Sequence, residues 1–190
     1  MKPWLLNILA CPIDKHHPLE AYFFSWETHE EDIIENADNA GLPEDQFKKN
    51  YKQLSKQLGD GTISPQAIRH IKDASGSEGS ERLLAVALDA LSRLEDSSEK
   101  NEGERLEKHS QDIDTLHRYL NQLEVETGLL VCSECGRWYP IGSSVETIPE
   151  MLPDDLREEK KDLEWMKKWR KLIPEKILEG GRPFNLKDNG

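Results

Sequence analysis

The stretch that decides the fold is Cys132-Ser133-Glu134-Cys135-Gly136, a Cys-x-x-Cys-Gly motif. The remaining cysteine of the chain opens a similar motif, Cys11-Pro12-Ile13-Asp14, in which an aspartate stands where a second cysteine would complete it. Two such motifs together form the tetrahedral site of a zinc ribbon. The spacing therefore predicts one ribbon made from both ends of the chain and interrupted by a long insertion.

The predicted metal site has three thiolates and an open question about its fourth ligand. Asp14 holds the motif position, His16 lies five residues after Cys11, and His17 follows it. Because carboxylate is a poorer zinc ligand than thiolate, the sequence favours a histidine, His16. A metal-free ribbon, held by its strands and by the helices around it, is the alternative. The predicted ligand set is Cys11, His16, Cys132 and Cys135.

Short strands flank both motifs. Residues 19–25 alternate and are rich in aromatic side chains, residues 129–131 lead into the second motif, and residues 138–141 lead out of it. These three strands predict a small antiparallel, zinc-ribbon-like sheet, preceded by a short helix over residues 3–10. The fold class is α+β, with an all-helical bundle inserted into the ribbon.

The insertion has the periodicity of helices. Apolar residues recur at spacings of three and four over residues 43–58, 65–71, 80–94 and 106–123, with Ser80 as the expected cap of the third helix. A further helix is expected from Pro153 to about Trp169, followed by a weakly structured tail from Gly180. The predicted domains are residues 1–26 with 128–157 as the ribbon, 27–127 as the insertion, and 158–190 as a C-terminal helix and flexible tail.

Charge is concentrated in the insertion. The chain has 190 residues and a formal net charge of −12. Residues 27–127 hold 23 acidic and 12 basic residues, a net charge of −11, whereas the flanks together hold 14 acidic and 13 basic residues and carry −1. Since phosphate binding needs clustered Lys and Arg, the insertion is not expected to bind nucleic acid by itself.

Cysteine usage and hydropathy predict where the protein works. Three cysteines cannot form a disulfide framework, which favours a reducing, cytoplasmic compartment. No apolar run approaches the ~20 residues that span a bilayer, so no membrane is expected as a partner. The apolar start of the chain contains Pro3 and Asn7 and lacks a small-residue cleavage site, so we interpret it as folded structure.

The sequence offers no recognisable catalytic constellation. It has no phosphate-binding glycine loop, no serine-centred elbow and no dinucleotide fingerprint. The residues after Cys135 indicate a strand, unlike the helix that follows a thioredoxin-like motif. The histidines form no pattern that would place a base beside a nucleophile.

A dense apolar stretch follows the second motif and is interrupted by prolines. Packing in the ribbon core is one interpretation, but so small a ribbon cannot bury all of it. An exposed strand edge with aromatic side chains invites pairing with a strand of another protein, and Trp, Tyr and Met are enriched at interfaces. The predicted partner-binding residues are Trp138, Tyr139, Ile141, Ile148, Pro149, Met151 and Leu152.

Three segments carry a family resemblance. Residues 1–12 (MKPWLLNILACP), 132–141 (CSECGRWYPI) and 148–153 (IPEMLP) resemble the Trm-one-twelve family, the small activating subunit of tRNA, rRNA and release-factor methyltransferases. Lys15-His16 also fits the archaeal style of that family. The resemblance covers roughly residues 1–26 and 128–157, and the insertion lies where the family places its variable domain.

The resemblance implies a non-catalytic function. Members bind Rossmann-like, S-adenosylmethionine-dependent methyltransferase subunits as heterodimers, extend the partner's sheet by a strand, and cover its apolar surface. Several catalytic chains compete for one such subunit, the partner holds S-adenosylmethionine, and tRNA is met only through the complex. Carried over by position, Cys11, His16, Cys132 and Cys135 match the family's zinc ligands, and residues 138–141 and 148–152 match its partner-facing part. The rival hypothesis is a zinc-ribbon nucleic-acid-binding module.

Overall fold

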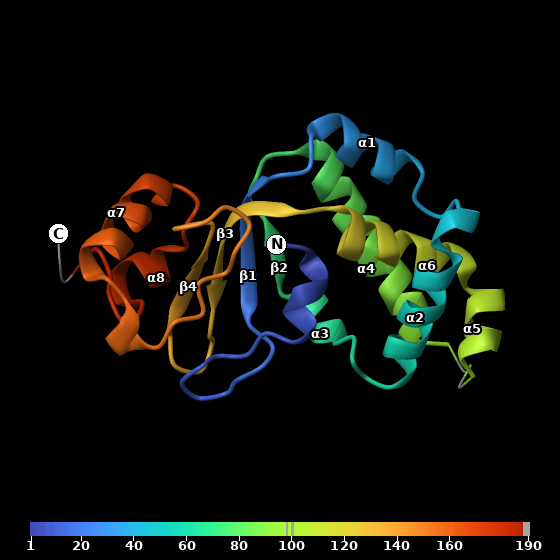
Figure 1. Cartoon of the computed structure of the whole chain (residues 1–190), viewed down its shortest axis with the longest axis horizontal. Coiled ribbons are helices and arrows are strands. Elements are labelled where there is room, and N and C mark those ends of the chain that lie inside the picture. Colours follow the sequence, from blue (N-terminus) through green and yellow to red (C-terminus); the bar gives the residue numbers. More distant parts are fainter. Residues whose placement is uncertain (98, 100, 188–190) are drawn as a thin grey trace.

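A computed structural model of the chain describes residues 1–97, 99 and 101–187. The molecule has three layers: a group of helices, a central sheet, and two C-terminal helices on the opposite side of that sheet (Figure 1). The predicted α+β class and the helical insertion are confirmed.

The sheet has four strands in the order β2-β1-β3-β4. The strands are β1 (Glu20–Trp26), β2 (Ile71–Asp73), β3 (Val125–Val131) and β4 (Trp138–Ile141). β3 is antiparallel to both β1 and β4, as expected for a ribbon, but β2 runs parallel to β1. The prediction of a purely antiparallel sheet was therefore wrong, because the insertion itself contributes one edge strand.

The helix predicted over residues 65–71 is shorter than expected. Helix α3 (Pro65–Arg69) begins at the predicted cap, where the Ser64 side chain accepts a hydrogen bond from the Ala67 amide, and it ends before Ile71. Ile71 instead pairs with Ala21 in the parallel ladder and is buried against β1. A β-branched residue suits a strand at least as well as a helix, so local spacing alone could not decide this position.

The other helices of the insertion differ from the prediction at their caps and in one internal break. Helix α4 (Glu78–Glu95) is capped by Ser77, whose side chain accepts from the Ser80 amide at 3.1 Å, whereas the expected cap, Ser80, is buried and donates to Asp73. The helix predicted over 106–123 is broken at His109. The remaining helical elements of this layer are η1 (Pro3–Asn7), α1 (Glu30–Asp38), η2 (Asp45–Phe47), α2 (Lys48–Gly59), α5 (Glu102–Lys108), α6 (Ser110–His117) and the π-helical turn η3 (Arg118–Gln122).

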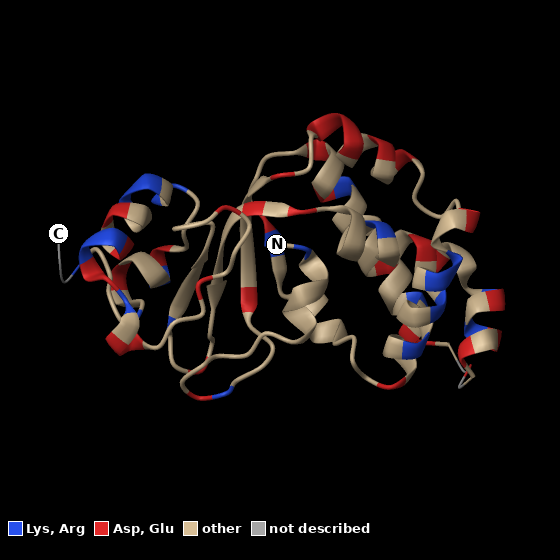
Figure 2. Cartoon of the chain, in the orientation of Figure 1, with Lys and Arg blue, Asp and Glu red and all other residues tan. Residues whose placement is uncertain are grey.

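Helix α1 was missed by the sequence analysis. Its first turn is acidic, which stabilises the positive end of the helix dipole. Only Ile33 of this helix is buried, so the helix shows no apolar stripe that periodicity could detect. Figure 2 shows the resulting row of acidic residues along α1, consistent with the charge assigned to the insertion.

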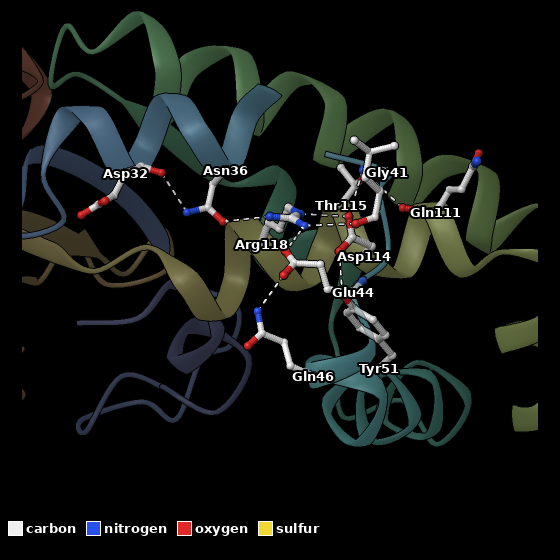
Figure 3. Close-up of polar contacts among 11 residues, drawn as sticks. Asp32, Asn36, Gly41, Glu44, Gln46, Tyr51, Gln111, Asp114, Thr115 and Arg118 are labelled. Atoms are coloured by element: carbon white, nitrogen blue, oxygen red, sulfur yellow. Dashed lines mark hydrogen bonds and ion pairs between the residues drawn. The ribbon is translucent and has the colours of Figure 1, made fainter. Parts of the chain in front are cut away.

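A buried polar network fastens the segment between α1 and α2 to α6 (Figure 3). The Asp114 carboxylate, which is fully buried, accepts from the Arg118 Nε at 3.0 Å, from the Tyr51 hydroxyl at 2.7 Å and from the Gly41 amide at 2.9 Å. The Arg118 guanidinium also donates to a Glu44 carboxylate oxygen at 2.7 Å. Every group in this low-dielectric site thus has a partner, as a buried charge requires.

The two faces of the sheet bury different sets of side chains. Ala21, Phe23, Leu130, Tyr139 and Ile141 belong to the core shared with the insertion. The alternate positions form a second apolar cluster with the C-terminal helices α7 (Glu159–Trp169) and α8 (Glu175–Gly180): Tyr22, Phe24, Leu129, Val131, Trp138, Trp165, Met166, Ile173 and Ile177.

The helix expected from Pro153 begins later. Residues Asp154–Leu156 form the single 3₁₀ turn η4, and α7 starts at Glu159. Beyond α8, residues 181–187 pack back on the sheet, with the Trp138 indole donating to the Phe184 carbonyl at 2.9 Å. Residues 188–190 of the predicted flexible tail lie outside the described residues. Within the described part of the chain, no helix has the length and apolar character needed to cross a membrane.

Candidate functional site

The two motifs fold into equivalent turns. In the first, the Lys15 amide donates to the Cys11 carbonyl at 2.9 Å, and in the second, the Gly136 amide donates to the Cys132 carbonyl at 3.0 Å. Lys15 and Gly136 both have left-handed backbones, with φ of 65° and 71°. Because the turns correspond residue by residue, Asp14 lies at the position that Cys135 occupies in the second turn.

Four donor groups from these turns converge. One donor atom from each of Cys11, Asp14, Cys132 and Cys135 lies within 4.8 Å of every other. The Cys11 and Cys135 sulfurs are 3.8 Å apart, and the Cys132 sulfur is 3.4 Å from Asp14 Oδ2. The strand β3 delivers Cys132, and the loop before β1 delivers Cys11 and Asp14, so the cluster joins segments that are far apart in the sequence.

These distances fit a tetrahedral zinc ion. Zn–S bonds of about 2.3 Å at a tetrahedral angle place two sulfurs about 3.8 Å apart, and a Zn–O bond of about 2.1 Å places sulfur and oxygen about 3.6 Å apart. The Cys11–Cys135 spacing of 3.8 Å matches the first value, and the Cys132 sulfur lies at 3.6 Å and 3.4 Å from the two Asp14 oxygens. The donor set of three sulfurs and one carboxylate is therefore one that could hold zinc.

The structure brings Asp14, not His16, into this cluster. The His16 ring faces the Ser133 hydroxyl, with Nε2 3.0 Å from Oγ, and His17 Nδ1 is 3.0 Å from the Leu9 carbonyl. The structure thus brings the alternative, Asp14, into the cluster, and the identity of the fourth zinc ligand stays a prediction. The reason is geometric: the tight turn from Cys11 to Lys15 directs position 14 inward and leaves position 16 outside.

Hydrogen bonding and burial shift the pKa values of Asp14 and Cys132 in opposite directions. The pKa of Asp14 lies well below its usual range, chiefly because its carboxylate accepts from the His16 amide, and then from the neighbouring thiols. Burial raises the pKa of the Cys132 thiol to about 12. Asp14 is thus ionised, whereas Cys132 is protonated until a cation replaces its proton.

Tyr139 is a neighbour of the cluster that the sequence analysis did not connect with it. Its hydroxyl lies 3.1 Å from the Cys11 sulfur, and its side chain is fully buried. Desolvation and this contact raise the pKa of Tyr139. A hydroxyl that can donate to a thiolate sulfur orients that ligand from outside the donor shell. Only the tertiary structure reveals it, because Tyr139 and Cys11 come from opposite ends of the chain.

The predicted partner-binding residues separate into two groups. Trp138, Tyr139 and Ile141 are fully buried, so their side chains offer nothing to a partner in this conformation. Pro149 and Met151 are partly buried, and Met151 packs against the main core. The structure therefore leaves Ile148 and Leu152 as the predicted residues with an exposed apolar surface.

Exposed apolar side chains gather in the segment that contains these two residues. Among the described residues, nine large hydrophobic side chains are exposed, and four of them fall within residues 145–156. Their exposed fractions are 60% for Val145, 50% for Ile148, 39% for Leu152 and 62% for Leu156. Because the segment pairs with β4 through Pro149, it lies at the edge of the sheet.

Comparison with known proteins identifies the family of this chain. A family model described as Trm112p-like protein matches residues 2–142, which include both turns and all four strands. The comparison with curated proteins finds no match. The matched region covers most of the chain, so this protein belongs to the Trm112p-like family, the family of non-catalytic methyltransferase activator subunits that the sequence resembles.

Proposed function

We propose that this chain is the activating subunit of several S-adenosylmethionine-dependent methyltransferases of the Rossmann-like class, which modify tRNA, rRNA and a translation release factor in the cytoplasm. The catalytic chains compete for it and hold the cofactor, and tRNA is met only within the complex. The observation that carries the proposal is the exposed apolar segment 145–156 at the sheet edge of a chain from an activator family.

In this proposal, activation results because the activator covers an apolar surface of the catalytic chain. An interface of ordinary size buries about 800 Å² on each partner. A catalytic chain that folds only marginally by itself is stabilised by mass action when a second subunit binds its folded form. The activator then needs no catalytic group of its own.

The cysteine cluster is the structural support of this surface. Zinc held by Cys11, Asp14, Cys132 and Cys135 fastens the N-terminal turn to the turn between β3 and β4. Such closed sites contribute folding energy and supply no chemistry to a reaction. Through β4, the same cluster supports the strand with which residues 148–150 pair.

Co-expression tests the proposal. Each Rossmann-like methyltransferase chain of the source organism is produced with and without this protein, and its solubility, S-adenosylmethionine binding by calorimetry and methyl transfer are measured. We expect at least one catalytic chain to become soluble and able to bind its cofactor only in the presence of this protein. Catalytic chains that are all equally soluble and active alone would contradict the proposal.

Charge substitutions test the surface. Ile148→Asp and Leu152→Asp should each weaken binding to such a catalytic chain by about tenfold or more, because buried apolar anchors carry most of the affinity at interfaces. Leu42→Asp is the matched control, since Leu42 is 59% exposed but lies in the insertion. Circular dichroism should be the same for all three variants. Equal loss of affinity in the Leu42 control would remove the segment 145–156 from the interface.

A further inference from the structure

Strand β4 forms one edge of the sheet, and its outward-facing backbone groups are already occupied. Tyr139 and Ile141 face β3, so Trp138, Pro140 and Gly142 face outward. Pro140 has no amide hydrogen. Its carbonyl accepts from the Glu150 amide at 2.8 Å, and the Gly142 amide donates to the Ile148 carbonyl at 3.0 Å. The chain immediately after β4 thus folds back on one half of this edge.

The other half of the edge is covered by a segment from the far end of the chain. The Trp138 amide donates to the Arg182 carbonyl at 3.1 Å, and the Arg182 amide donates to the Gly136 carbonyl at 3.0 Å. These bonds form a parallel bridge between Arg137 and Arg182. The Trp138 carbonyl accepts from the Arg157 guanidinium. Residues 181–185, which we name the strap, therefore take the position of an added strand.

The strap is only partly buried. Helices α7 and α8 bury a whole apolar cluster, whereas in the strap Gly181 and Asn185 are buried, Phe184 is partly buried and Arg182 is exposed. The indole of Trp138 donates to the Phe184 carbonyl. Within the strap, the side-chain nitrogen of Asn185 donates to the Gly181 carbonyl at 3.4 Å. Without the strap, the Trp138 amide and the Gly136 carbonyl would be open at the edge, whereas the Trp138 carbonyl would still be bonded to Arg157.

Gly181 makes the close approach of the strap possible. A Cβ at this position would lie 2.6 Å from the Ile177 carbonyl oxygen and 2.9 Å from Cδ1 of Trp138. The neighbouring Gly180 has no atom within 4 Å of its own added Cβ. Of these two glycines only Gly181 is required by packing, at the point where the strap leaves α8 and passes Trp138.

We propose that the strap is an intramolecular competitor for the β4 edge: an edge strand of the methyltransferase sheet pairs with residues 136–138 only after the strap has left. The inference rests on the proposed function and adds its regulation. The closed strap reduces the fraction of molecules that are competent to bind, and the apparent affinity falls by that fraction. It also protects an otherwise open edge from unwanted pairing in the free protein.

The test compares Gly181→Ala with Gly180→Ala in the full-length protein. In the first variant the added Cβ clashes with Trp138 and with Ile177 at the end of α8, and in the second it meets no atom within 4 Å. Binding is measured to the catalytic chain found by co-expression, and hydrogen exchange is measured at the Trp138 amide. We expect Gly181→Ala to bind about fivefold more tightly than the wild type and to lose protection at Trp138, because overpacking favours the open strap. Gly180→Ala should match the wild type in both measurements.

A second variant tests whether tighter binding comes from opening of the strap and not from a general loss of structure. Asn185→Ala removes the side chain whose amide faces the Gly181 carbonyl and whose oxygen accepts from the Lys187 amide, without adding any atom. It should also tighten binding, by about twofold for the loss of such a hydrogen bond. Melting of the insertion, followed by circular dichroism, should be unchanged in all variants.

The outcomes separate this inference from the proposed function. A wild-type protein that binds a catalytic chain, with Gly181→Ala and Asn185→Ala binding equally or more weakly, overturns the inference alone. If neither the wild type nor the variants bind any catalytic chain, the proposed function fails and the inference fails with it. Binding by the Gly181→Ala protein alone would support both.

Discussion

At the scale of single residues, Asp14 is the most informative position. In the sequence, Asp14 stands where a zinc motif has its second cysteine. In the structure, its carboxylate lies within 4.8 Å of the three sulfurs and is kept ionised by a hydrogen bond from the His16 amide. Three thiolates and one carboxylate carry more negative charge than a set with a neutral imidazole. We therefore propose that Asp14 replaces the missing cysteine as an anionic zinc ligand.

Replacement of Asp14 should weaken zinc binding. Loss of a residue that only orients a metal ligand already costs about 10–100-fold in affinity, so Asp14→Ala, which removes a proposed ligand, should cost at least that much. His16→Ala is the control, since the His16 ring faces Ser133 outside the cluster. Zinc content by mass spectrometry and competition with a chelator give the measurement. Loss of zinc in the His16 variant, with retention in the Asp14 variant, would restore the original ligand assignment.

A second residue, His117, should make stability depend on pH. Its ring is buried beside Phe47 and Tyr51, and desolvation lowers its pKa from 6.5 to about 4. The unfolded chain therefore binds a proton between these values while the folded protein does not. Stability is fully present above pH 6.5 and is lost as the pH falls toward 4.

Substitution of His117 isolates this effect. Relative to pH 7, the wild type should lose about 1 kcal/mol at pH 5 through this group, after allowance for solvent screening. His117→Phe should remove that part of the slope, and His29→Gln, at an exposed position, should keep it. Urea denaturation at several pH values measures the slope. An identical slope in the wild type and His117→Phe would show that His117 does not titrate in this range.

At the scale of elements, the helices of the insertion are joined by more than apolar contacts. The Asp114–Arg118 pair lies within one turn of helix, with side chains that are 0% and 4% exposed, and it reaches the α1–α2 connection through Gly41 and Glu44. The pair sits where α6 gives way to the π-helical turn η3. Helical periodicity places an acid and a base four residues apart, but it cannot say that they are buried.

Breaking this pair should be costly, whereas removing it completely should not. Asp114→Leu leaves a buried guanidinium without its main partner and should destabilise the protein by about 3–5 kcal/mol. The double variant Asp114→Leu/Arg118→Met should recover a large part of that loss. Arg93→Ala is the surface control: its pair with Asp112 is exposed on the arginine side, so it should cost less than about 1 kcal/mol. Strictly additive losses in the double variant, measured by urea denaturation, would contradict this.

At the scale of the whole molecule, the C-terminal helices determine which side chains of the sheet stay exposed. The region that matches the family ends at residue 142, and α7 and α8 lie beyond it. They cover the face of the sheet that a simple ribbon would leave open, with Trp165 stacked on Trp138 at 5.8 Å and on Phe24 at 6.0 Å. Trp138, which the sequence predicted to face a partner, is thereby buried in a second core.

Truncation of Trp165 should therefore destabilise this half of the molecule. Trp165→Ala should cost about 3–5 kcal/mol, the usual loss for a buried large aromatic residue. Hydrogen exchange should show α7, α8 and the strap open first, while the insertion stays protected. Leu156→Ala, at a side chain that is 62% exposed, should change stability by less than about 0.5 kcal/mol. Uniform loss of protection throughout the chain would mean that the two cores unfold as one unit.

The sequence by itself determined the features that depend on local pattern. The paired motifs predicted that both chain ends meet, the alternation over residues 19–25 predicted β1, and the charge count located the acidic insertion. It could not determine the features that depend on distant neighbours. Whether Asp14 or His16 enters the cluster follows from the turn at Lys15, and the strand at Ile71 follows from pairing with β1. The burial of Trp138 follows from α7, α8 and the strap, because periodicity records that a side chain is apolar but not which segment covers it.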